Sequence, residues 1–323
     1  MASPDWRPSA SLAVLRERAA IVDRVRTFFK DRGLLEVETP ALSVAAVTDP
    51  NISSFELPWN GPDPGKRYLH TSPEFPMKRL LAGGSGDIWQ IARVFRDGEA
   101  GRRHNPEFSL LEWYRVGWDH HRLMDEVEDL LRLVMPELDD VHRLTYADAF
   151  LRCDAPDPHG TEPEQWHAFI RRVGIDVPDV ERLDAAQCRD LVLTHRVEPR
   201  LPRACFLHAY PADQAALARV SPARADTPAL AERFELYIDG VELANGFHEL
   251  ADSTEQRARF ESENRSRVKQ GMPPVVWDDS LLAALDHGLP DCAGVALGID
   301  RLVMTALGLR ALSEVMAFPV DRA

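Results

Sequence analysis

Two carboxylates near the end of the chain, Glu235 and Glu242, lie on either side of Asp239-Gly240. Asp-Gly is typical of a two-residue hairpin turn, and the flanking residues alternate between apolar and polar types. The pattern predicts a hairpin with strands over Phe234–Ile238 and Val241–Asn245. Such a turn brings the two acids close together on neighbouring strands.

The expected register decides which side chains share a face of this hairpin. Ile238 should lie opposite Val241, and Tyr237 opposite Glu242. Because side chains alternate along a strand, one face should hold Glu235, Tyr237, Glu242 and Ala244. Two acids on one face repel each other unless a cation lies between them, and Mg²⁺ accepts one or two carboxylates together with substrate phosphates. An amphipathic hairpin with a solvated acidic face is the alternative.

A basic loop follows the strand predicted over Ile88–Phe95 and precedes a second strand over Glu107–Tyr114. It contains Gly98 and four basic residues in an otherwise acidic protein. Arginine forks match phosphate oxygens, so the loop suits a triphosphate better than the tip of a solvated hairpin. The basic residues are Arg96, Arg102, Arg103 and His104.

The second strand places an acid among large apolar side chains. Phe108, Leu110, Glu112 and Tyr114 should share one face, with Trp113 on the other. A carboxylate in such surroundings is costly unless it meets a cation, which points to a substrate ammonium group.

Two further segments carry charge at helix starts. Tyr68–Glu74 reads as a strand and a polar turn, in which Pro73 fixes the backbone and Glu74 opens a helix. Near the C-terminus, small residues up to Gly298 predict a strand, and Ile299 begins a helix. Arg301 in the first turn opposes the helix dipole unless it meets an anion such as phosphate. The alternatives are ordinary helix-start charge at Glu74 and a solvent-facing Arg301.

The remaining elements must position these groups. Helical periodicity predicts helices over Ser11–Arg32 and Leu123–Val134, and alternation predicts a strand over Leu34–Thr39. His120-His121 is interpreted as a surface pair at a turn. Residues 155–203 show no defensible chemistry and are interpreted as an insertion with two helices.

Composition limits the class of protein. The chain has 323 residues, 28% of them charged, and a formal net charge of -14, which disfavours a broadly basic nucleic-acid surface. The four cysteines are far apart and suggest neither a zinc cage nor a disulfide framework. No apolar stretch reaches bilayer length and the N-terminus has no apolar run, so we expect a cytoplasmic protein without membrane partners.

The order of these segments resembles the catalytic core of class II aminoacyl-tRNA synthetases. The segment ending in Gly33-Leu-Leu-Glu-Val-Glu-Thr-Pro40 is similar to motif 1, Phe95–Tyr114 to motif 2, and Gly294–Arg301 to motif 3. Thr71–Glu74 and Glu242–Glu249 resemble lysine and ATP elements of lysyl-tRNA synthetase. In particular, the chain resembles the truncated family that ligates (R)-β-lysine to elongation factor P.

This resemblance implies an α+β fold, with a mostly antiparallel sheet flanked by helices, in one catalytic domain over residues 1–323. It implies ATP as a substrate, Mg²⁺, and a homodimer formed through the motif 1 region. Arg96 and Arg301 would be catalytic, and Glu235 and Glu242 would bind the metal. The implied substrate-binding residues are Ser72, Pro73, Glu74, Glu112, Tyr114 and Glu249. The implied ATP-binding residues are Arg96, Asp97, Gly98, His104, Asn105, Glu242, Leu243, Gly298 and Arg301.

Two departures affect these roles. Synthetases of this class usually have Glu two residues after the motif 2 arginine, whereas Gly98 stands there and the acid is Glu99. Ala296 stands where lysyl-tRNA synthetases usually have Gly, and one methyl group can shift preference between close isomers by roughly 1–3 kcal/mol. That shift agrees with a β-amino acid substrate.

About a dozen residues precede the motif 1 helix, too few for the anticodon-binding barrel of lysyl-tRNA synthetases. Together with the acidic charge, this makes elongation factor P the expected acceptor rather than tRNA. The expected reaction is adenylation of (R)-β-lysine or lysine, followed by transfer to a lysine ε-amine of that protein. The alternatives are tRNA aminoacylation and a non-catalytic sensor built on the synthetase fold.

Overall fold

The computed structural model describes residues 6–323. The chain divides into two compact units, each with its own part of the sheet and its own helices. The first unit comprises residues 1–117, 133–135 and 251–323, and the second comprises residues 118–132 and 136–250.

The central strands of the first unit run β1-β5-β6-β12. Strand β5 (Ile88–Phe95) pairs in parallel with the short β1 (Leu35–Glu36) and antiparallel with β6 (Glu107–Val116), which pairs antiparallel with β12 (Cys292–Gly298). A separate three-stranded sheet has the order β2-β4-β3, and its strands are Leu42–Ser43, Gly65–Leu69 and Glu56–Trp59 respectively.

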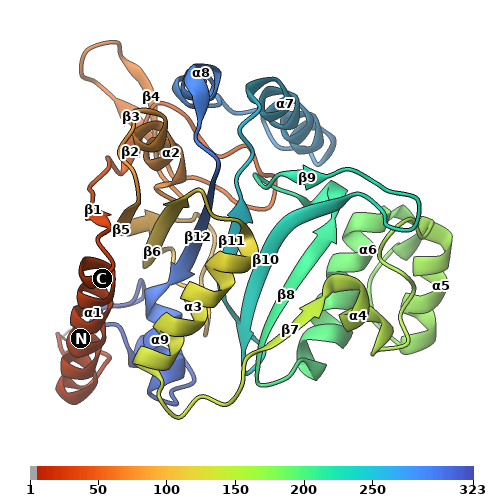
Figure 1. The fold of residues 1–323 in the computed structure, drawn as a ribbon, viewed down its shortest axis with the longest axis horizontal. Coiled ribbons are helices and arrows are strands. Elements are labelled where there is room, and N and C mark those ends of the chain that lie inside the picture. The colour runs from red at the N-terminus through yellow and green to blue at the C-terminus, as the bar shows by residue number, and fades with distance from the viewer. Residues whose placement is uncertain (1–5) are drawn as a thin grey trace, which may run out of the picture. The chain divides into compact units, whose positions relative to one another are not determined.

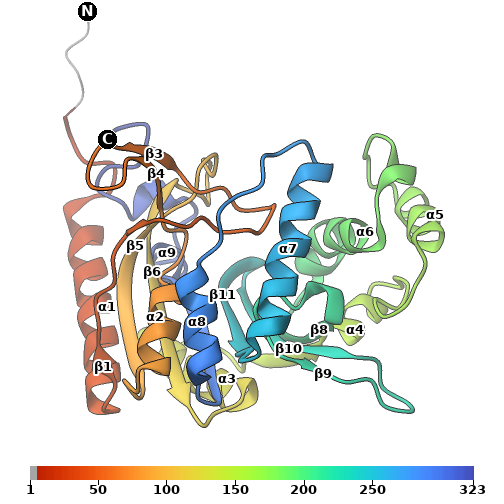
Figure 2. The ribbon, with the colours of Figure 1, turned by 90° about the horizontal axis from the view of Figure 1, so that it is seen from above.

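Helix α1 (Leu12–Asp31) covers part of this sheet through Phe29, whose ring stacks on Trp89 at 5.0 Å between centroids. Figure 2 shows three further helices of the unit side by side: α2 (Glu74–Ala82), α8 (Asp279–Gly288) and α7 (Ser253–Lys269). Helix α9 (Ile299–Ala306) follows β12 directly, and a short 3₁₀ turn, η5 (Leu312–Glu314), comes after it.

The second unit begins with α3 (His120–Val134) and contains the strand order β11-β10-β8-β7. These strands span Val241–His248, Leu230–Ile238, Ala204–Pro211 and His142–Thr145, and the short β9 (Val220–Ser221) also pairs with β10. Only β7 and β8 pair in parallel.

The helices of this unit gather beside β7 and β8, where Figure 1 draws α4, α5 and α6 in green. They span Tyr146–Leu151, Pro163–Val173 and Ala185–Val192, and short turns at Val180–Arg182, Leu193–Val197, Glu198–Arg200 and Ala212–Gln214 complete the unit. Their core is aromatic and includes Tyr146, Phe150, Trp166 and Tyr210.

The predicted α+β class is confirmed, because the sheet is mostly antiparallel with helices against it. The predicted first helix, both strands around the basic loop and the hairpin turn are also confirmed. The strand expected over Leu34–Thr39 is shorter, since only Leu35–Glu36 has ladder geometry. Among the described residues, no helix is both long and apolar enough to cross a membrane.

Two predictions were wrong. Ala244 does not share a face with Glu242, because the hairpin register shifts between Leu236 and Tyr237. His120 is not at the surface: it is the first residue of α3 and only 8% exposed, whereas His121 is exposed as expected.

Candidate functional site

Glu112 lies in the middle of β6 with 2% of its surface exposed. The Ser72 hydroxyl donates to its Oε2 at 2.8 Å, and the Tyr114 hydroxyl donates to its Oε1 at 2.7 Å. Each carboxylate oxygen is therefore oriented by a hydroxyl group. Hydrogen bonds to a charged acceptor are stronger than neutral ones, so this pair stabilises the ionised acid in a buried position. A buried, oriented carboxylate suits an ammonium group.

Ser72 also fixes the start of α2, because its hydroxyl oxygen accepts the Glu74 backbone N–H at 3.0 Å. Pro73 precedes the first helical residue, as the sequence predicts. The Glu74 carboxylate accepts from Lys78 Nζ at 2.6 Å, and Lys78 is almost fully buried. The structure therefore joins Ser72, Glu74 and Glu112 in one network, with Lys78 holding one oxygen of Glu74.

Arg96 lies at the start of the basic loop, where its backbone N–H donates to the Pro106 carbonyl at 2.9 Å. Its guanidinium lies 5.1 Å from the centroid of the Phe108 ring and 3.7 Å from Glu99. Its Nε is buried without a hydrogen-bond partner among the described residues. An anion could satisfy that donor, since guanidinium groups pair with carboxylate and phosphate oxygens.

Asp97 and Gly98 are exposed in the same loop, and Gly98 has the left-handed φ of +81° that favours glycine. The backbone of Asp97 is held by the Ser53 carbonyl at 2.8 Å. Further along, Gly101 and His104 exchange backbone hydrogen bonds, which closes the tip of the loop.

Arg301 meets this tip. Its Nη2 lies 2.8 Å from His104 Nε2, and its Nε donates to the Arg103 carbonyl at 3.3 Å. Burial of part of the ring and the charge of Arg301 lower the pKa of His104, so the imidazole is neutral at neutral pH and can accept from the guanidinium. The structure thus brings together the predicted basic loop and the predicted arginine at the start of α9.

Asn105 and Gly298 differ in what they contact. The Asn105 side chain is buried, donates to the Glu107 carbonyl at 2.6 Å and accepts the Val320 N–H at 2.9 Å. It therefore ties the loop to the C-terminal segment, and its contact with nucleotide stays a prediction. A methyl group at Gly298 would lie 3.8 Å from Arg301 Cβ, which is ordinary contact, so protein packing does not require glycine there.

Sequence reasoning missed Asp300, which ties three elements of the first unit together. Its Oδ2 accepts the Ser109 N–H of β6 at 2.7 Å, and its Oδ1 lies 2.8 Å from the Arg18 guanidinium of α1. Asp300 is 2% exposed. This ion pair fixes the start of α9 and hence the position of Arg301. The sequence signal for Asp300 was a charged residue in an otherwise apolar segment, directly before Arg301.

Glu235 in the second unit is buried on β10 and surrounded by donors. Its Oε2 accepts from the Tyr210 hydroxyl at 2.7 Å and from the Tyr237 hydroxyl at 2.6 Å, and its Oε1 pairs with Arg233. The surrounding negative charge, chiefly Glu235, outweighs burial and raises the pKa of Arg233 above its usual range. A carboxylate offers about four acceptor positions, so three are in use and one is left for a metal ion.

The hairpin bulge determines which residues accompany Glu235. Tyr237 pairs with Glu242, as predicted, but Leu236 pairs with Ala244 and Glu235 with Asn245. Asn245 therefore takes the place on the acidic face that was expected for Ala244, and Leu243 is the extra, buried residue. Two carboxylates on one face are oxygen donors of the kind that Mg²⁺ binds, so this pair fits that ion.

Glu249 follows the end of β11 and is buried. Its backbone forms an isolated antiparallel bridge with Ala218. Glu249 therefore belongs to the second unit, with Glu235 and Glu242, whereas Glu112 and Glu74 belong to the first.

Comparison with known proteins finds similarity over nearly the whole chain. Residues 3–322 match the family described as tRNA synthetases class II (D, K and N). The elongation factor P–(R)-β-lysine ligase of Yersinia enterocolitica is 51% identical over 324 residues, covering 98% of each chain. Proteins with the same name from Proteus mirabilis and Vibrio vulnificus are 49% and 47% identical, also over 98% or more of this chain and 98% of their own.

Proposed function

Because the chain belongs to the class II tRNA synthetases of the D, K and N type, we propose that it is an ATP-dependent ligase that joins (R)-β-lysine to a lysine ε-amine of elongation factor P. The observation that carries this proposal is the identity of about half of all residues to proteins of that name over 98% of the chain. The buried Glu112, oriented by Ser72 and Tyr114, supports a substrate with an ammonium group.

In the first step, the carboxylate of (R)-β-lysine attacks the α-phosphorus of ATP, the bond from that phosphorus to the α,β-bridging oxygen breaks, and pyrophosphate leaves. The nucleophile is already ionised at neutral pH and requires no general base. Arg96, whose Nε has no hydrogen-bond partner within residues 6–323, binds the α-phosphate and the substrate carboxylate. Arg301, with neutral His104 beside it, binds the γ-phosphate. Catalysis comes from alignment and neutralisation of charge.

The remaining residues bind the two ends of the substrates. Glu112 and Tyr114, with Glu249, bind the distal ammonium group, while Glu74 binds the amine nearer the carboxylate, with Ser72 and Pro73 fixing its position. Asp97, Gly98, Asn105, Leu243 and Gly298 are proposed to contact ATP. Glu235 and Glu242 would hold Mg²⁺, which when bound neutralises phosphate charge.

In the second step, a neutral lysine amine of elongation factor P attacks the carbonyl carbon of the adenylate. A new amide bond forms, the bond to phosphate breaks, and AMP leaves. The amine must first lose its proton. We further propose one catalytic domain, a homodimer formed through the segment around α1, and a cytoplasmic location.

Incubation of the protein with ATP, labelled (R)-β-lysine, elongation factor P and tRNA tests the acceptor. We expect label on elongation factor P alone; label on tRNA would contradict the proposal. The matched variant Glu242→Gln keeps the shape of the side chain but removes its charge, so amino-acid-dependent exchange between ATP and pyrophosphate should be lost. Exchange at the wild-type rate would exclude Glu242 as a metal ligand.

A further inference from the structure

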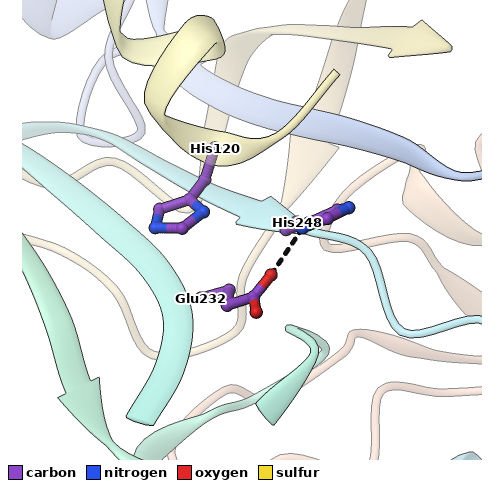
Figure 3. Close-up of side chains that lie close together, drawn as sticks. All are labelled: His120, Glu232 and His248. Carbon is purple, nitrogen blue, oxygen red and sulfur yellow. Dashed lines mark hydrogen bonds and ion pairs between the residues drawn. The ribbon is translucent and has the colours of Figure 1, made fainter. Parts of the chain in front are cut away.

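A second group of possible metal ligands lies in the second unit, apart from the residues assigned above. His120 of α3, Glu232 of β10 and His248 of β11 each offer one ligand atom, and these atoms all lie within 4.8 Å of one another. Figure 3 shows the three side chains converging, with the Glu232 carboxylate below the two imidazole rings. We propose that these residues bind one Zn²⁺ ion.

The backbone of the unit holds two of the ligands together. The Arg219 N–H donates to the His248 carbonyl at 2.8 Å, and the Arg219 carbonyl accepts the Glu232 N–H at 2.9 Å. Arg219 therefore fixes the neighbouring ends of β10 and β11. The Ser221 hydroxyl donates to Glu232 Oε1, which leaves Oε2 directed at His248 Nδ1. The carboxylate is thus oriented before any ion arrives.

His120 supplies the observation that points to a ligand. Only 8% of its surface is exposed, yet its Nδ1 has no hydrogen-bond partner among the described residues. A buried imidazole nitrogen normally has a partner, so an unmatched one facing a carboxylate and a second imidazole calls for an ion or a donor. Two imidazoles and one carboxylate are a common ligand set of Zn²⁺ sites, and a water molecule completes the fourth position.

The ligand types suit a divalent cation. Imidazole nitrogens bind Zn²⁺ in their neutral form, and the Glu232 carboxylate supplies negative charge beside them.

Only a small adjustment is required. Tetrahedral bonds of about 2.0–2.1 Å place ligand atoms about 3.3 Å apart. Glu232 and His248 are now in direct hydrogen-bond contact, so they would separate slightly, and the wider distances would close. Binding would fix the first turn of α3 against β10 and β11. Because His248 precedes Glu249, it would also fix the strand end that carries Glu249.

Titration of chelator-treated, full-length protein with Zn²⁺ tests the site, with millimolar Mg²⁺ present to occupy Glu235 and Glu242. We expect one tightly bound Zn²⁺ per chain. His120→Asn should weaken binding at least about 100-fold, the upper end of the effect of a residue that only supports a ligand. The exposed His142 on β7 provides the matched control, His142→Asn, which should bind as the wild type does.

A second variant keeps the proposal testable if His120→Asn folds poorly. Glu232→Gln retains acceptors for Ser221 and should remove the visible absorption of tetrahedral Co²⁺ bound in place of Zn²⁺. Zn²⁺ at 100 times its Kd should lower the unfolding equilibrium constant about 100-fold in the wild type only. Equal Zn²⁺ affinity in the wild type and His120→Asn would overturn the proposal, as would loss of the ion in Glu242→Gln instead.

Discussion

Glu263 on α7 is a half-buried acid that should make stability depend on pH. The Thr48 hydroxyl donates to its Oε2, and Thr48 itself is 2% exposed. Burial raises the pKa of Glu263 from its ordinary 4.5 to about 7; the Thr48 hydrogen bond opposes this shift and Asp49 adds to it. The folded state therefore binds more protons than the unfolded chain between these two pKa values.

The direction of the effect follows from that difference in bound protons. The contribution of Glu263 is fully present below the unfolded pKa of 4.5 and is lost as the pH rises through about 7. One pKa unit corresponds to about 1.4 kcal/mol, so ionisation of Glu263 lowers the free energy of unfolding by about 3 kcal/mol at pH 8. About 2.5 kcal/mol of this loss develops between pH 5 and pH 8. Glu263→Gln removes the titration while retaining an acceptor for Thr48.

Urea denaturation of both proteins at pH 5 and pH 8 measures this cost. The free energy of unfolding of Glu263→Gln, relative to wild type, should increase by about 2.5 kcal/mol from the lower to the higher pH. Glu261→Gln, at an exposed position of the same helix, should stay within about 0.5 kcal/mol of wild type at both. A difference between Glu263→Gln and wild type that does not change with pH would refute the reasoning.

Two further predictions concern the first unit. Tyr114→Phe removes one of two hydroxyl donors to Glu112, worth about 1.5 kcal/mol for a charged acceptor, so the KM for (R)-β-lysine in pyrophosphate exchange should rise about tenfold; an unchanged KM would exclude the contact. Asp300→Asn leaves the Arg18 guanidinium without its counter-charge and should cost about 2 kcal/mol or more in urea denaturation. Asp23→Asn, at an exposed position on α1, is its control and should be near neutral.

Local patterns were enough to predict the elements that carry the candidate site. The Asp239-Gly240 turn set the pairing of Tyr237 with Glu242, because a two-residue turn fixes the register on either side. The bulge that follows has no signal at its own position: Leu243 stands between Glu242 and Ala244 and is an ordinary strand residue rather than a glycine. Its extra residue depends on how β10 and β11 pair along their whole length, so the sequence alone could not reveal that Asn245 replaces Ala244.

Residues distant in the chain decided the burial of polar groups, and sequence patterns could not supply that information. A histidine pair at a helix start is usually exposed, yet Glu232 and His248, far along the chain, lie against His120. Likewise, the partners of Asp300 come from α1 and β6. Conversely, Glu112 was predictable, because an acid within an apolar strand face is unusual in itself.

The segment over residues 155–203 showed no chemistry in the sequence, and the structure explains its presence through packing. The Trp166 ring meets Phe150 edge-on at 5.8 Å between centroids, and Phe150 stacks on Tyr146 at 4.6 Å. All three rings are fully buried. The helices of this segment therefore build an aromatic core against α4.

That core extends to Glu235. The Tyr146 ring lies 4.6 Å from that of Tyr210, and the Tyr210 hydroxyl donates to the Glu235 carboxylate. Because a well-packed ring has little freedom to move, the position of the Tyr210 hydroxyl is set by packing that the inserted helices complete. If Glu235 binds a metal ion through its remaining acceptor position, the orientation of its carboxylate depends on hydrogen-bond donors that stay in place. The inserted segment thus affects the proposed metal ligand through the packing of its side chains.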